Sequence, residues 1–248
     1  MSEDHTSALE VRDITHAYGD VSVLEDVSVT VERGSVVALL GPNGSGKTTL
    51  LSIATGLRDP DSGSVSRRQA AARTVGYVPQ RPAFRPQFSV AETIEFYGTL
   101  VSGAVDVPAV LDRVGLTAVA DRHIPALSGG MVRLLGLAQA TIGEPPLLTL
   151  DEPASGLDPQ LRHHIADVIV DIAGDGTAVL LATHDLAAAE RIADEILVLD
   201  GGSIVARGSP AHLREQADTD SLEGAFDAIL ERDGLVGVRA SAGGETDD

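Results

Sequence analysis

Apolar and polar residues alternate near the start of the chain, over residues 9–14 and again over residues 27–31. A period of two predicts strands with one buried face. Further strands are predicted by mostly apolar runs, and a hairpin is predicted around Asp200-Gly201-Gly202. These runs lie at residues 36–40, 74–78, 147–150 and 178–182, and the hairpin strands at 195–199 and 203–207.

Helical patterns separate and follow these strands, which together indicate an α/β fold. They lie at residues 49–55, 91–100, 108–114 and about 128–142, with others starting near 155–159 and after 210. Pro82 and Pro86 precede the second pattern, and Ser89 with Glu92 has the form of a capping box at its start.

This order predicts a helical subdomain inserted into an α/β core. We expect the insert over about residues 83–146 and the core over about residues 8–82 and 147–215. Residues 216–248 are expected to form a helical tail, whose end, from residue 240, is small, acidic and disordered. The tail carries an apolar stripe at Leu222, Phe226, Ile229 and Leu230.

The strongest chemical signal is the glycine-rich run between strand 36–40 and helix 49–55. It consists of Gly41, Pro42, Asn43, Gly44, Ser45, Gly46, Lys47 and Thr48. Glycines allow a tight turn whose backbone N–H groups face phosphate oxygens, and the helix N-terminus adds partial positive charge. Lys47 can reach the outer phosphates, and the Thr48 hydroxyl can bind Mg²⁺. The strand and the helix beside it argue against a chance match, so the run predicts a nucleoside triphosphate site.

Two further signals follow strands 147–150 and 178–182. Asp151 and Glu152 end the first, where adjacent carboxylates are costly unless they bind metal or transfer protons. In a phosphate-loop protein the aspartate would hold Mg²⁺ and the glutamate would orient the attacking water. His184 follows the second strand, and its place at a strand's carboxyl end favours a site role over a helix cap with Asp185.

Weaker signals come from a second glycine-rich helix start and from an aromatic residue. Ser128, Gly129 and Gly130 open a helix and could bind an anion, although a plain helix cap is the better interpretation from these residues alone. Tyr18 could stack on an adenine ring, but an aromatic side chain near a strand end more often serves packing.

The charge balance indicates the kind of solution in which the protein works. The chain has 37 acidic and 18 basic residues, a formal net charge of −19, and Lys47 is its only lysine. A GC-rich genome explains arginine in place of lysine but not the acid excess, so we predict a salt-rich cytoplasm such as that of salt-loving archaea. The surface argues against broad nucleic-acid contact. With no cysteine, no long apolar run and a polar N-terminus, we expect neither a disulfide, a membrane span nor a signal peptide.

In their order along residues 9–230, these stretches resemble the ATP-binding subunit of an ABC transporter. Residues 41–48 match the Walker A motif of that family, residues 147–152 match Walker B, and residues 155–158 match the D-loop. Gln80 matches the Q-loop glutamine and His184 the switch histidine. Residues 127–131 resemble the LSGGQ signature.

The resemblance implies a P-loop NTPase core of the RecA-like type over residues 1–215, with an antiparallel β subdomain and the α-helical insert. Two copies, or one copy and a homologous ATPase subunit, would enclose two ATP molecules. It implies phosphate contacts from the Walker A backbone, Lys47, Thr48 and Thr49, and from Ser128, Gly129 and Gly130 of the other copy. It also implies a Mg²⁺ site at Thr48, Gln80 and Asp151, and adenine stacking on Tyr18.

For hydrolysis, the resemblance implies that Glu152 acts as the general base, with contributions from His184, Gln80 and Lys47. The partner would be a separate transmembrane permease, and this cytoplasmic chain would lie peripherally on the inner face of the cell membrane. Residues 221–226 resemble the tails of subunits that serve exporter-type (ABC-2) permeases. Residues 130–140 resemble the corresponding stretch of subunits linked to copper-enzyme maturation systems, such as nitrous oxide reductase assembly. Met131 departs from the family's glutamine, and Ala154 from a common threonine.

Three other functions compete with a transport ATPase. A soluble regulatory or assembly ATPase of the same fold would not fractionate with membranes. A non-catalytic nucleotide-binding module is disfavoured because Asp151, Glu152 and His184 are all present. A kinase would leave the Ser128 turn unexplained.

Overall fold

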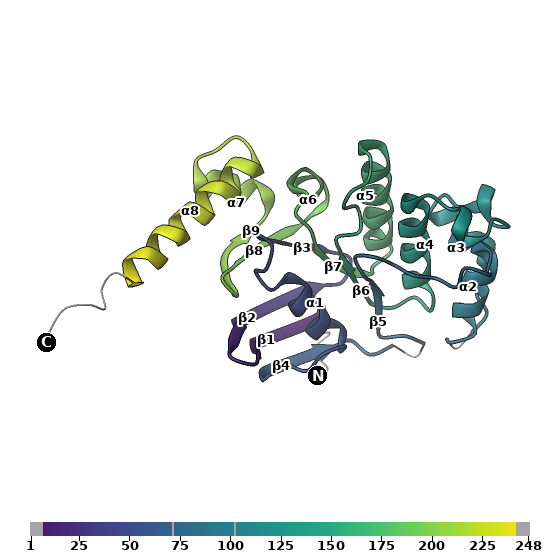
Figure 1. The fold of residues 1–248 in the computed structure, drawn as a ribbon, viewed down its shortest axis with the longest axis horizontal. Coiled ribbons are helices and arrows are strands. Elements are labelled where there is room, and N and C mark those ends of the chain that lie inside the picture. Colours follow the sequence, from purple (N-terminus) through teal and green to yellow (C-terminus); the bar gives the residue numbers. More distant parts are fainter. Residues whose placement is uncertain (1–6, 71, 102, 242–248) are drawn as a thin grey trace, which may run out of the picture.

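The computed structural model describes residues 7–241, apart from residues 71 and 102 (Figure 1). Its architecture confirms the predicted α/β class with an antiparallel sheet and a helical insert. Two sheets and three groups of helices make up this part of the chain.

Six strands form the central sheet, in the spatial order β5-β6-β7-β3-β8-β9. They are β3 (Val36–Leu40), β5 (Val75–Val78), β6 (Leu147–Asp151), β7 (Ala178–Ala182), β8 (Glu195–Asp200) and β9 (Ser203–Gly208). The first five run parallel, and β9 pairs antiparallel with β8 as the predicted hairpin. Every residue of β3, β6 and β7 is buried, as expected for parallel strands covered on both faces. Their carboxyl ends therefore meet at one edge of the sheet.

The second sheet is antiparallel and has the order β2-β1-β4, formed by β1 (Ser7–Tyr18), β2 (Val21–Glu32) and β4 (Ser62–Arg67). Its inner face packs on the central sheet and on α1 (Lys47–Thr55), which explains the alternation in β1 and β2.

The pattern of apolar residues predicted neither β4 nor the full lengths of β1 and β2. Strand β4 has one apolar side chain, Val65, and its residues are exposed or only partly buried at the sheet edge. Backbone pairing with β1 holds it in place, and such pairing leaves no apolar pattern to read.

The helical insert contains α2 (Val90–Gly98), α3 (Val107–Arg113), two short 3-10 turns (Thr117–Val119 and Ile124–Ala126) and α4 (Gly129–Thr141). The predicted capping box is present: Glu92 N donates to Ser89 Oγ (3.1 Å) and Ser89 N donates to Glu92 Oε2 (2.8 Å). The insert packs with α5 (Pro159–Gly174) in one apolar cluster.

The remaining helices are α6 (Leu186–Ile192), α7 (Pro210–Ala217) and α8 (Leu222–Ser241). Helices α7 and α8 lie beside β9, at the opposite end of the molecule from the insert, and α6 lies between them and α5 (Figure 1). Leu222 and Ala225 are buried there with side chains of β3 and β8. Helix α8 runs to Ser241, two residues into the segment expected to be disordered, and residues 242–248 lie outside the described part. Among the described residues, no helix has the length and apolar character that a bilayer crossing requires.

Candidate nucleotide site

The glycine-rich loop between β3 and α1 has a backbone that only glycine accommodates at key positions. Gly46 caps α1 in a left-handed conformation (φ 106°), and a Cβ there would lie 2.7 Å from a methyl carbon of Leu24. A Cβ on Gly41 would collide with the carbonyl oxygen of Leu199. The Lys47 ammonium folds back over the loop and donates to the carbonyls of Gly41 (2.7 Å) and Pro42 (2.8 Å). The loop is thus held from both sides.

A cavity of about 300 Å³ lies in front of this loop, at the carboxyl edge of the central sheet. It brings together most of the residues that the sequence singled out. Its lining is Val23, Asn43, Gly44, Gly46, Lys47, Thr48, Thr49, Gln80, Asp151 and Glu152.

The loop fits an anion. The buried Ser45 hydroxyl has no hydrogen-bond partner, so it is free for a ligand atom. The N-terminus of α1, whose cap makes no side-chain bond, directs backbone N–H groups toward the same point. Lys47, only 8% exposed, adds a full positive charge.

Thr48 and Asp151 meet on one side of the cavity. The Thr48 hydroxyl lies 3.1 Å from Asp151 Oδ2 and 3.3 Å from Oδ1. Burial raises the pKa of the Asp151 carboxyl, and the hydrogen bond from Thr48 opposes that shift. Burial lowers the pKa of Lys47, while the carboxylates of Glu152 and Asp151 oppose it. A hydroxyl beside a buried carboxylate, with phosphate space in front, suits Mg²⁺ held through oxygen ligands.

Glu152 is held by its backbone as well as by its neighbours. It adopts a left-handed conformation (φ 50°), uncommon for a residue other than glycine, and its N–H donates to the carbonyl of Ala182 (2.9 Å). Its Oε2 lies 2.7 Å from His184 Nδ1, but no donor is aligned with this oxygen. The two side chains are therefore close without an aligned hydrogen bond, and the carboxylate keeps an acceptor for water.

A second hollow of about 300 Å³ lies next to the loop. It is lined by Leu40, Gly41, Pro42, Asn43, His184, Leu186 and Phe226. Asn43 belongs to both hollows, and the His184 side chain, 61% exposed, reaches from the second hollow to Glu152.

Tyr18 lies at the end of β1 and lines neither hollow. The residue is 47% exposed, its ring centroid lies 5.0 Å from that of His16 in an edge-to-face arrangement, and the Arg58 guanidinium lies over its ring at 4.7 Å. Asp61, from the same turn as Arg58, accepts from Ala17 N (2.7 Å) and so fastens this turn to β1.

The turn before α4 is separate from the cavity. Ser128 Oγ caps the helix by accepting from Met131 N (3.3 Å), so the plain-cap interpretation is correct for its side chain in the single chain. A Cβ on Gly129 would meet no atom within 4 Å, whereas one on Gly130 would collide with Leu161. Ser128, Gly129 and Gly130 are absent from the lining of both hollows around the phosphate loop.

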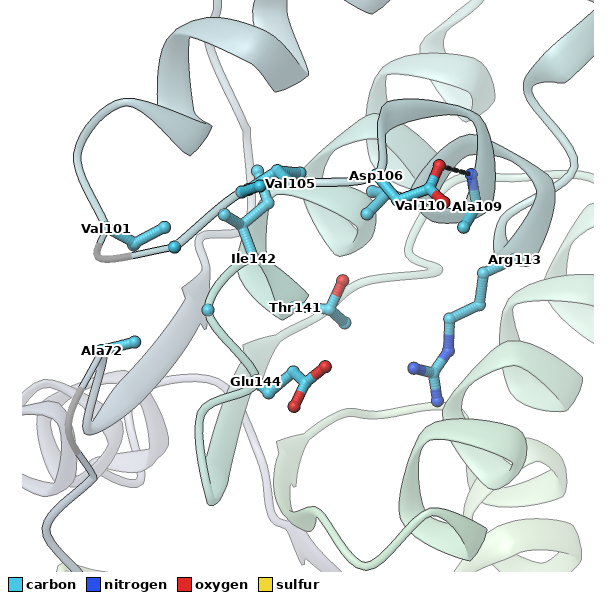
Figure 2. A pocket seen from close by; sticks show the side chains of 13 residues that line it. Ala72, Val101, Val105, Asp106, Ala109, Val110, Arg113, Thr141, Ile142 and Glu144 are labelled. Atoms are coloured by element: carbon cyan, nitrogen blue, oxygen red, sulfur yellow. Dashed lines mark hydrogen bonds between the residues drawn. The ribbon is translucent and has the colours of Figure 1, made fainter.

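A hollow of about 490 Å³ lies away from this site, between α3 and the end of α4 (Figure 2). Asp106 there caps α3 by accepting from Ala109 N (3.1 Å), and Arg113 pairs with Asp175 (2.6 Å). No residue predicted for the nucleotide site lines it.

Three residues near the site were not predicted as site residues from the sequence. Val23 and Arg58 carry no motif that marks them, because only the folding of β2 and of the turn after α1 brings them close. Phe226 was noted only as part of the tail stripe and the exporter-like tail segment.

A parallel sheet whose carboxyl edge carries this loop beside two carboxylates defines the phosphate-loop class of nucleoside triphosphatases. Residues 24–155 match the ABC transporter family. The chain is 37% identical over 256 residues to the Nod factor export ATP-binding protein I of Cupriavidus pinatubonensis, covering 94% of this chain and 79% of that protein.

Solved structures of ABC transporter subunits have the same fold as this chain. A structure of the ATP binding subunit of an ABC transporter is similar with a TM-score of 0.79 and 29% identity, covering 90% of this chain and 99% of that chain. The dimeric structure of a post-hydrolysis state of an ATP-binding cassette bound to ADP and Pi shares the fold, with a TM-score of 0.72 and 24% identity over 81% of this chain and 98% of that chain. The chain belongs to the ABC transporter family, as a subunit that binds and hydrolyses ATP.

Proposed function

We propose that this ATPase subunit drives a separate export permease, and that it hydrolyses ATP between two copies of the chain. The observation that carries the proposal is the convergence of Lys47, Thr48, Gln80, Asp151 and Glu152 on one cavity at the phosphate loop.

In the proposed site, the phosphates of ATP lie against the backbone of residues 41–46, the Lys47 ammonium group, and Thr48 and Thr49. Thr48, Gln80 and Asp151 would hold Mg²⁺, which when bound would neutralise charge on the β- and γ-phosphates. The unpartnered Ser45 hydroxyl and the tethered Lys47 support this placement. Tyr18 would stack on the adenine ring, with Arg58 as a second support of its ring.

Glu152 would accept a proton from the attacking water, whose oxygen bonds to the γ-phosphorus. The bond from that phosphorus to the bridging oxygen breaks, and ADP and inorganic phosphate leave. The free acceptor on Glu152 Oε2 and the strained backbone that holds it favour this role. His184, in contact with Glu152, would reach the γ-phosphate.

The turn at Ser128, Gly129 and Gly130 supports the second copy. It has backbone N–H groups at the start of a 13-residue helix but no contact with the phosphate-loop cavity of its own chain. In the proposed pair, each turn covers the γ-phosphate held by the other copy.

The export direction is supported by the name of the relative from Cupriavidus pinatubonensis. We propose that binding to the permease keeps the chain on the inner face of the cell membrane. The names of the relatives do not support the copper-enzyme maturation system, which stays a prediction from residues 130–140.

Glu152→Gln tests the catalytic assignment. We expect turnover to fall by about a hundredfold or more, since proton transfer is lost, while the Kd for ATP stays within about threefold. Glu144→Gln is the matched control, because Glu144 also has a left-handed backbone (φ 49°) but lies outside the cavity. Unchanged turnover in Glu152→Gln, measured in low and in molar salt, would refute Glu152 as the base.

The partner is tested with the same variant, which should trap the ATP-bound pair. Tagged Glu152→Gln protein is captured from detergent-solubilised membranes, and the proteins that accompany it are identified. A stoichiometric multi-span membrane protein is expected. Recovery only from the soluble fraction, without such a protein, would favour a regulatory or assembly ATPase.

A further inference from the structure

The start of α8 is fixed firmly to the body of the molecule. Ser221 accepts from Gly224 N with its hydroxyl (3.1 Å) and from Ala225 N with its carbonyl (3.1 Å). Leu222 and Ala225 are 1% and 0% exposed and pack with Ala38, Leu40 and Val198. The first turn of the tail helix therefore has a defined position relative to β3, the strand that leads into the phosphate loop.

Phe226 follows this anchored turn and lines the second hollow. The same hollow is lined by residues 41–43 of the phosphate loop and by His184. One aromatic ring from the tail thus shares a hollow of about 300 Å³ with the phosphate loop and with a residue that contacts Glu152.

The two sides of the hollow are not equally restrained. The phosphate loop is held by the two bonds from Lys47 and by the close contact between Gly41 and the Leu199 carbonyl. The His184 side chain is 61% exposed, and the 2.7 Å contact with Glu152 is its one polar contact within the described part of the chain. Removing the Phe226 ring would therefore free His184 far more than it would move the loop.

We propose that Phe226 is a positioning residue for ATP hydrolysis, whose ring restricts His184 to the orientation that contacts Glu152. The inference rests on the proposed function of Glu152 and His184. It makes the C-terminal helix part of the hydrolytic unit, so that α8 acts on turnover and not on nucleotide binding.

The test is Phe226→Ala in the full chain. Turnover at saturating ATP falls about tenfold, while the Kd for ATP, measured with a fluorescent nucleotide, stays within about twofold. Phe226→Leu keeps an apolar wall and restores most of the turnover. Ile229→Ala is the matched control, because Ile229 lies on the same helix and packs in the same apolar cluster without lining the hollow. Similar shifts in Tm for the two alanine variants, with loss of turnover only in Phe226→Ala, support positioning.

A double-mutant cycle with His184→Ala shows whether the effect passes through His184. In that background Phe226→Ala lowers turnover by less than about twofold, because the group it positions is gone. Normal turnover in Phe226→Ala, an equal loss in Ile229→Ala, or a full tenfold further loss in the double variant would overturn the proposal. If the wild type turns over ATP and Glu152→Gln does not, those results overturn this inference alone, whereas an inactive wild type overturns the proposed function with it.

Discussion

The phosphate loop before α1 and the turn before α4 are both glycine-rich starts of a helix. The first lies against Lys47, Thr48, Asp151 and Glu152 in one cavity, with its lysine tied to the loop by two hydrogen bonds. The second uses Ser128 as a cap and leaves Gly129 facing open space. A helix N-terminus becomes a built anion site only where other elements supply charge and enclosure, and in the proposed pair those elements would come to the second turn from the other copy.

Asp151→Asn gives the largest expected effect on turnover, because it removes a negative charge from the cavity at the phosphate loop. Turnover with Mg²⁺ should fall by a hundredfold or more. The nucleotide-free protein should become more stable at pH 7, by a few degrees in Tm, since the buried carboxylate ionises at a cost.

The direction of this change in stability follows from the raised pKa of Asp151. A carboxyl whose pKa is raised by folding loses its contribution to stability as the pH rises through that value, so the advantage of the Asp151→Asn variant over the wild type should shrink on acidification. Asp175→Asn, at an exposed ion pair with Arg113, is the control and should shift Tm by about 1 °C or less. A lower Tm for Asp151→Asn would show that the charge stabilises the fold.

Gly129→Ala tests the second turn and should have an intermediate effect. The fold has room for the methyl group, and alanine favours a helix, so Tm should be unchanged or higher. Turnover should fall about tenfold, because the methyl group occupies the surface that would cover the other copy's nucleotide. ATP-dependent pairing, followed by sedimentation in the Glu152→Gln background, should weaken in parallel.

Gly130→Ala sharpens the same comparison. Its methyl group would collide with Leu161, so both Tm and turnover should fall. Normal pairing and turnover in Gly129→Ala would remove the second turn from the proposed site.

Met131→Gln should have the smallest effect. The Met131 side chain packs partly against the apolar cluster of the insert, and its N–H keeps the bond to Ser128 Oγ whatever the side chain. Turnover should change by about twofold or less. A tenfold rise would show that the family's glutamine makes a polar contact that this chain lacks.

Much of the site was readable from the sequence because its parts are local. Residues 41–48 carry their own turn geometry, and Asp151, Glu152 and His184 follow strands whose apolar runs are unmistakable. Parallel strands place their carboxyl ends at one edge of the sheet, so the strand pattern alone predicts that these residues converge. The capping box at Ser89 was predictable for the same reason.

Other features depend on contacts between distant segments. The edge strand β4 has too few apolar residues to be predicted from periodicity. Arg58 lies over Tyr18 in a region where Asp61 accepts a hydrogen bond from Ala17 of β1. The hydrogen bond between Thr48 and Asp151 joins residues 103 positions apart, and its competition with burial sets the direction of the Asp151 pKa.

The amino-acid sequence by itself determined the phosphate loop, the order of most strands and helices and the membership of an ATPase class, because turn chemistry and apolar periodicity act over a few neighbouring residues. Only the tertiary structure decided that Arg58 lies over the Tyr18 ring and that Phe226 lines one hollow with His184. Both depend on how segments far apart in the sequence pack together, and packing is set by the shapes of surfaces that no single stretch of sequence contains.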